Sequence, residues 1–78
     1  MNNAIESEWF EYESWDSYDL DYGDIVFHNC KLKKDIGNFK AGEFVPDINV
    51  IYSKSMIEIY DGKEIFRYKM KLTIEDYV

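Results

Sequence analysis

The sequence predicts a mainly β protein: a small antiparallel sheet, either a meander or a partly closed barrel, with a short N-terminal helix as an option. Three observations predict this class: a segment of strict polar and apolar alternation, an Asp-Gly dipeptide before it, and an aromatic content of 18 % in 78 residues. Such an aromatic content also disfavours general disorder. We expect a single domain, 1–78, with an acidic aromatic segment, 1–24, and a β-meander body, 25–78.

The clearest element is the segment 64–74. Its apolar positions are the even-numbered ones, Phe66, Tyr68, Met70, Leu72 and Ile74. The polar positions between them are Arg67, Lys69, Lys71 and Thr73. Because successive side chains of a strand point to opposite faces, this pattern predicts a strand whose even-numbered side chains are buried.

The dipeptide Asp61-Gly62 precedes this strand and is typical of hairpin turns, in which glycine readily adopts positive φ angles. Residues 56–60 are therefore expected to form the antiparallel partner strand. A third strand is expected over 48–52, with Pro46 marking its start because proline cannot donate to a strand ladder. These three consecutive strands make up the predicted meander.

Further strands are expected upstream of the meander. Residues 25–33 begin with β-branched and aromatic side chains and predict a strand that ends at a turn over 34–38. Ala41-Gly42 predicts a second turn. Alternation around Tyr18 predicts a strand that begins there, and Gly23 is a candidate bulge within it.

The segment 3–16 is ambiguous between strand and helix. Asn3 followed by Glu6 resembles a capping box, which would begin a helix. However, Trp, Phe, Tyr, Ser and Asp are mediocre helix formers, and the aromatic residues favour strands. We therefore expect a short strand over 8–13, with a helical turn as the alternative.

His28 and Cys30 are the only histidine and cysteine. The predicted strand puts both on one face with Val26 and Leu32, which would allow a nucleophile pair or two metal ligands. No third residue completes either kind of site, so we interpret both as packing residues. No glycine-rich phosphate loop or converging acid pair is recognisable. We expect no catalytic activity, no metal and no cofactor.

The most informative feature is the distribution of charge. The first 24 residues contain eight of the sixteen carboxylates and none of the nine Lys and Arg residues, in a chain of net charge −7. Such asymmetry favours a basic protein partner. The expected partner-binding residues are Glu6, Glu8, Trp9, Glu11, Tyr12, Glu13, Asp16, Asp19, Asp21 and Asp24. The aromatic residues among them would supply buried contact area. A surface kept acidic for solubility alone is the open alternative.

Two stretches, 6–13 and 18–24, mix Asp and Glu with Tyr, Trp and Phe. In this they resemble the small acidic DNA mimics that phages encode, such as anti-CRISPR and anti-restriction inhibitors. The resemblance is one of composition, and these inhibitors share no motif whose residues could be carried over. It implies an inhibitor that occupies the basic nucleic-acid-binding surface of a host defence complex, in the host cytoplasm.

Two other functions remain open from the sequence. Arg67, Lys69 and Lys71 form a basic stripe on the best strand, which could make the chain a small nucleic-acid-binding barrel. A non-catalytic assembly subunit is the other alternative. We favour the inhibitor, because a chain of charge −7 repels nucleic acid. The acidic N-terminus lacks the apolar core of a signal peptide, and no apolar run is long enough to span a membrane. A cytoplasmic protein without membrane contact is expected.

Overall fold

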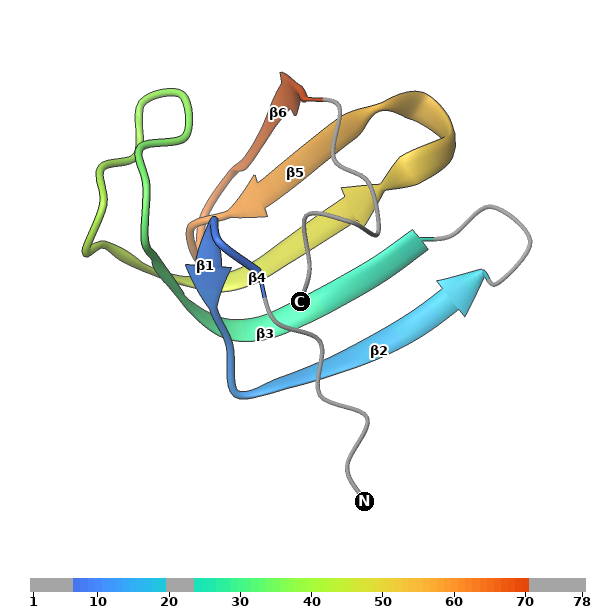
Figure 1. Ribbon diagram of the computed structural model, residues 1–78, viewed down its shortest axis with the longest axis horizontal. Helices are drawn as coiled ribbons and strands as arrows, with labels where there is room; N and C mark the ends of the chain where they lie inside the picture. Colours follow the sequence, from blue (N-terminus) through green and yellow to red (C-terminus); the bar gives the residue numbers. More distant parts are fainter. Residues whose placement is uncertain (1–6, 20–23, 71–78) are drawn as a thin grey trace.

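The computed structural model describes residues 7–19 and 24–70, which form one antiparallel sheet (Figure 1). The strands are β1 Phe10–Glu11, β2 Ser14–Asp19, β3 Asp24–Leu32, β4 Phe44–Ile51, β5 Met56–Tyr60 and β6 Ile65–Lys69. Their order is β1-β3-β4-β5-β6, with β2 also paired to β3. The prediction of a mainly β, antiparallel fold is confirmed. The candidate capping box at Asn3, the candidate bulge at Gly23 and the end of the chain from 71 onward lie outside the described residues.

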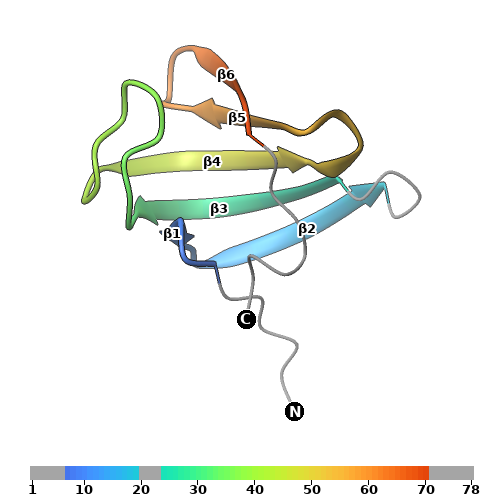
Figure 2. The same cartoon turned by 45° about the horizontal axis from the view of Figure 1, so that its top comes forward.

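The predicted meander is present as β4, β5 and β6, which lie side by side in Figure 2. The β5–β6 hairpin pairs Tyr60 with Ile65, and Gly62 in the connection has a φ of 103°. The Asp61 carboxylate accepts hydrogen bonds from the two following backbone N–H groups of the turn, Lys63 and Glu64, both at 2.8 Å. Asp61 therefore organises the turn through its side chain, and Gly62 supplies the positive φ.

Two predicted boundaries of β4 are wrong. The strand begins at Phe44, two residues before Pro46, and Tyr52 starts a short 3-10 turn, Tyr52–Lys54, instead of ending the strand. Pro46 is tolerated inside β4 because the pairs on either side of it, Val45 with Cys30 and Asp47 with His28, keep the ladder in register.

The strand predicted over 64–74 is shorter in the structure: β6 begins at Ile65 and ends at Lys69, so Met70 already lies outside it. Burial alternates as predicted over the described residues. Phe66, Tyr68 and Met70 are half-buried and pack against the core. The odd-numbered residues of the strand, Ile65, Arg67 and Lys69, are exposed. Leu72 and Ile74, for which burial was also predicted, lie outside the described residues.

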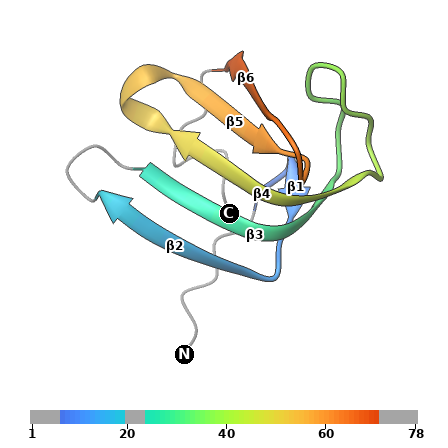
Figure 3. The same cartoon turned by 180° about the vertical axis from the view of Figure 1, so that it is seen from behind.

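The acidic aromatic segment is an integral part of the sheet. Both β1 and β2 pair with the same strand, β3 (Figure 3). In the register of these pairs, Phe10 is opposite Leu32 and Asp16 is opposite Val26. Over 7–19 no residue is helical, so the strand interpretation holds there. The strand expected over 8–13 is reduced to the two residues of β1, and the next strand begins at Ser14 and not near Tyr18.

The alternation of buried and exposed side chains along β3 is interrupted halfway along the strand. Phe27 and Cys30 are both fully buried although they are three residues apart, and His28 and Asn29 between them point away from the core. Asn29 has a φ of 54°, a left-handed conformation that asparagine tolerates better than most residues. The prediction that His28 and Cys30 share one face is therefore wrong, because the single left-handed residue shifts the alternation.

In the neighbouring strand β4, the alternation of buried and exposed side chains is interrupted at the same level. Val45 and Ile48, the partners of Cys30 and Phe27, are both buried, whereas Pro46 and Asp47 between them are not. Because both strands shift together, the pairing register is kept and the sheet changes direction as a unit. This corner places Phe44 on the outer face, where its side chain is 76 % exposed.

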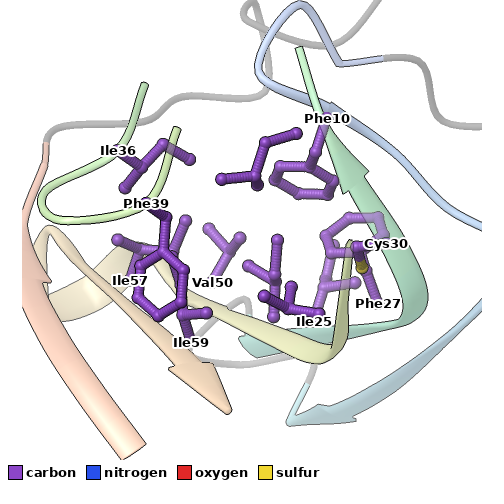
Figure 4. Close-up of a cluster of buried hydrophobic side chains, with 12 residues drawn as sticks. Phe10, Ile25, Phe27, Cys30, Ile36, Phe39, Val50, Ile57 and Ile59 are labelled. Carbon is purple, nitrogen blue, oxygen red and sulfur yellow. The ribbon is translucent and has the colours of Figure 1, made fainter. Parts of the chain in front are cut away.

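The core lies on the inner side of the bent sheet (Figure 4). It consists of Phe10, Ile25, Phe27, Cys30, Leu32, Ile36, Phe39, Val45, Ile48, Val50, Ile57 and Ile59. The rings of Phe10 and Phe27 meet edge to face with centroids 5.0 Å apart. Over the described residues the sheet is open, since no pairing joins β6 to β1 or β2. Apolar burial of this kind contributes about 25 cal/mol per Å² and is the main force that stabilises the fold.

Two core residues come from the connection between β3 and β4. Ile36 and Phe39 are buried, and their backbones exchange two hydrogen bonds of 2.9 Å. Gly37 between them has a φ of 58°, and a Cβ atom there would stand 2.1 Å from the Tyr68 ring. The predicted turn over 34–38 therefore covers part of the core and packs against Tyr68 of β6.

Candidate functional site

The strands β1 and β2 form an edge of the sheet that carries exposed carboxylates. Four of the predicted partner-binding residues are exposed there, and we call this set the acidic edge: Glu8, Glu11, Glu13 and Asp16. Phe10, Tyr12 and Trp15 alternate with them and pack into or against the core. Glu8 precedes β1 and Glu13 lies between β1 and β2, so strand alternation alone does not separate the acids from the rings. The four carboxylates are nevertheless all exposed, whereas the rings pack into or against the core.

The other predicted acids are placed differently. Asp19 ends β2, and Glu6 and Asp21 lie outside the described residues. Asp24 begins β3 and is half-buried, with its Oδ1 atom fully buried. Asp24 therefore does not belong to the exposed set.

Several acidic-edge carboxylates have partners within the molecule. Glu8 lies 3.5 Å from the Lys34 ammonium, and Glu11 is opposite Lys31 in the β1–β3 register. Glu13 accepts a hydrogen bond of 2.9 Å from the Asn29 amide. Because the contacts of Glu8 and Glu13 are exposed, each is worth about 0–1 kcal/mol and only biases the position of its carboxylate.

The two aromatic residues that were predicted to contact a partner lie largely against the molecule itself. Trp9 is half-buried, and the Lys34 ammonium lies 4.8 Å from the centroid of its ring. The Tyr12 ring is 4.8 Å from that of Phe27. The core therefore takes up much of the ring area that a partner was expected to cover.

The most exposed large apolar residues of the described chain are ones that the sequence did not single out. Phe44 is 76 % exposed, Ile65 56 % and Tyr60 37 %. Simple alternation along β4 would place Phe44 on the same face as Ile48, which is buried. The exposure of Phe44 could not be predicted from the sequence, because β4 changes face together with β3 at the level of Asn29.

His28 joins two carboxylates across the outer face of the sheet. Its Nδ1 atom is 2.7 Å from Asp47 on β4, and its Nε2 atom is 2.8 Å from Asp16 on β2. We call these three residues the His28 cluster. The hydrogen bonds to Asp47 first and to Asp16 second raise the pKa of His28 above its usual 6.5. A neutral imidazole has only one N–H to donate, so the protonated ring alone satisfies both carboxylates.

Cys30 is fully buried in the core, and burial raises its pKa to about 12. A thiol in this state is not a nucleophile at neutral pH, and the His28 ring lies on the other face of the sheet. The packing interpretation of Cys30 is confirmed by its position in the core. Over residues 7–19 and 24–70, no group of three or more His, Cys, Asp and Glu side chains is arranged to hold a metal ion.

A shallow depression of about 320 Å³ lies on the outer face beside β1. Its lining is Glu11, Tyr12, Glu13, Asn29, Lys31 and Phe44, and we call it the β1 depression. Ligand pockets range from about 300 to 1,000 Å³, so this volume suits a single side chain better than a larger ligand. The Lys31 ammonium lies 5.6 Å from the centroid of the Phe44 ring.

The basic stripe on β6 is partly neutralised by its neighbour β5. Arg67 donates from Nε to Glu58 across the two strands at 2.5 Å. Lys69 is exposed, and Lys71 lies outside the described residues.

Comparisons of this chain with protein-family models, with curated proteins and with solved structures found no match. Within the part of the chain that the structure describes, no helix is long and apolar enough to cross a membrane. The function must therefore be argued from the residues themselves.

Proposed function

We propose that this protein is an acidic inhibitor that binds the basic nucleic-acid-binding surface of a partner protein and excludes nucleic acid from it. The single observation that carries the proposal is the acidic edge, in which four carboxylates face solvent from one edge of the sheet. The compositional resemblance to phage DNA mimics supports the same role, with the host cytoplasm as its place of action.

The mechanism would be competition for cationic side chains. Arg and Lys residues that normally contact phosphates would instead meet the carboxylates of the acidic edge, and long-range attraction would speed the encounter. The rigid pairing of β1 and β2 with β3 supports this role, because the carboxylates are presented without a prior ordering step. No catalytic step and no cofactor are part of the proposal.

The nucleic-acid-binding alternative has weaker support. Its basic stripe would need Arg67 for phosphate contacts, but Arg67 is engaged by Glu58 on the neighbouring strand. Lys69, the other member of the stripe that the structure describes, is exposed, but one lysine on this strand of a chain with charge −7 attracts nucleic acid poorly.

The test is affinity capture from a host lysate followed by binding measurements on the retained protein. We expect the association rate to fall steeply between 50 and 500 mM salt, since the Debye length shrinks from about 10 Å at 0.1 M to about 3 Å at 1 M. We also expect added DNA or RNA to displace the protein. Binding that is insensitive to both salt and nucleic acid would contradict the proposal and favour an assembly subunit.

A matched pair of variants separates the acidic edge from bulk acidity. Glu11→Gln removes one exposed carboxylate from the acidic edge, and Glu64→Gln removes one from the exposed β5–β6 turn. We expect the first to slow association several-fold and the second to have little effect, because screening confines each charge to its own neighbourhood. Equal effects would mean that only net charge matters.

A further inference from the structure

We propose that the β1 depression is an anchor for one arginine side chain of the partner. This inference rests on the proposed function, because it names the chemistry by which the acidic edge holds a basic protein. The depression combines what a guanidinium needs: carboxylates at its rim, an exposed aromatic ring, and room for one side chain in about 320 Å³.

The carboxylates are those of Glu11 and Glu13, which both line the depression and are both exposed. Glu11 ends β1, and Glu13 lies in the bend that precedes β2. The Asn29 amide donates to one oxygen of Glu13 at 2.9 Å, which biases the position of this carboxylate before a partner arrives. A planar guanidinium with its five N–H groups can bond several carboxylate oxygens at once.

The aromatic wall is Phe44. Its side chain is 76 % exposed, because β4 changes face at Pro46 and Asp47, between the buried Val45 and Ile48. An exposed ring of this size gains from contact with the flat, weakly hydrated face of a guanidinium. The Lys31 ammonium lies 5.6 Å from the ring centroid, within the about 6 Å of a cation–π contact, so the ring is accessible to a cation.

Lys31 also defines how the anchor would work. In the free protein its ammonium lies over Phe44, and its register partner across the strands is Glu11. We infer that the incoming arginine takes the place over the ring and that Lys31 turns toward the carboxylate of Glu11. Lys31 therefore competes with the partner for the depression, and its removal should strengthen binding.

The alternative occupants fit less well. A nucleic-acid phosphate would meet two carboxylates, which repel it. A lysine of the partner could neutralise those carboxylates, but its compact, strongly hydrated ammonium gains less from the Phe44 ring and cannot bond in a planar fork. The observations thus favour arginine over lysine, which is a testable distinction.

The experiment compares nona-arginine with nona-lysine as probes at 150 mM salt, by fluorescence anisotropy and by NMR mapping of the binding site. A cation–π contact at an exposed site corresponds to about a two- to fivefold change in affinity. We expect the wild-type protein to bind nona-arginine about fivefold more tightly, with the largest NMR shifts at Phe44, Asn29 and Lys31.

Phe44→Ala should reduce the preference for arginine to less than about twofold, because nona-lysine loses less affinity than nona-arginine when the ring is removed. Because Phe44 is so exposed, its truncation should leave the melting temperature nearly unaltered. Lys31→Gln should strengthen arginine binding and increase the preference. Lys63→Gln is its matched control, since Lys63 is an exposed cation on the β5–β6 turn, and it should leave the preference unchanged.

The outcomes distinguish the anchor from the proposed function. Equal binding of the two peptides by the wild-type protein, with no effect of Phe44→Ala, would overturn the anchor. If Glu11→Gln then still weakened binding more than Glu64→Gln, the acidic edge would stand as the binding surface without an arginine pocket. If neither peptide bound the wild-type protein, the anchor and the proposed function would both fail.

Discussion

Replacement of His28 should make the protein less stable in mildly acidic solution but should matter little in alkaline solution. The ring nitrogens of His28 lie 2.7 Å from Asp47 and 2.8 Å from Asp16, and these hydrogen bonds raise its pKa above 6.5 in the folded protein. A raised pKa means that folding favours the protonated ring. The stabilisation is therefore fully present below pH 6.5 and is lost as the pH rises through the folded-state pKa.

The expected magnitude follows from the exposure of the three side chains. His28 is 28 % exposed, Asp47 41 % and Asp16 62 %, so solvent screens both pairs. Exposed ion pairs contribute about 0.2–1 kcal/mol each, which gives about 1 kcal/mol for the two contacts together. For a domain of this size, that corresponds to a change of about 4–8 °C in melting temperature.

The assay is urea unfolding of the wild-type protein and His28→Gln from pH 5.5 to pH 8.5. We expect the wild type to be more stable by about 1 kcal/mol at pH 5.5, with the difference shrinking toward pH 8.5. The control is a double-mutant cycle of His28→Gln and Asp47→Asn. Asp47→Asn should lower the free energy of unfolding less in the His28→Gln background than in the wild type. A difference that stays constant or grows with pH would refute the role assigned to the His28 cluster.

Three further predictions concern the core. Gly37→Ala should destabilise the fold for two reasons: the left-handed backbone costs about 1–2 kcal/mol, and the new methyl group clashes with the Tyr68 ring. In thermal melts, adding Tyr68→Leu should recover the stability lost to the clash but not the stability lost to the backbone. Cys30, with a pKa of about 12, should resist thiol reagents at pH 7.5 and react only when urea unfolds the protein; rapid labelling of the native state would show that it is not buried. Phe27→Ala should lower the free energy of unfolding by about 3–5 kcal/mol, whereas Phe44→Ala should lower it by less than about 0.5 kcal/mol. Similar losses for the two variants in denaturant titrations would mean that the buried and exposed faces of β3 and β4 are assigned wrongly.

Much of the candidate site followed from the sequence, but its details did not. The acids of 1–24 were identified by charge, and four of them are exposed together on the acidic edge. The expected partner contacts of Trp9 and Tyr12 stay a prediction, because an aromatic residue between acids has no sequence signal that distinguishes a partner contact from a core contact, and both rings are half-buried. The structure shows both packed against the core.

The sequence by itself determined the fold class, the β4–β5–β6 meander and the alternation of burial from Ile65 to Met70. These features depend on residues that are neighbours along the chain, so a period of two and an Asp-Gly turn are sufficient to predict them.

Only the tertiary structure decided which face His28, Cys30 and Phe44 occupy. Asn29 adopts a left-handed conformation that shifts the alternation of β3, and β4 shifts with it. The result places Cys30 in the core, His28 between Asp16 and Asp47, and Phe44 beside the acidic edge. A local pattern assumes that a strand continues without interruption, and the carboxylates that meet His28 come from 12 and 19 residues away in the chain.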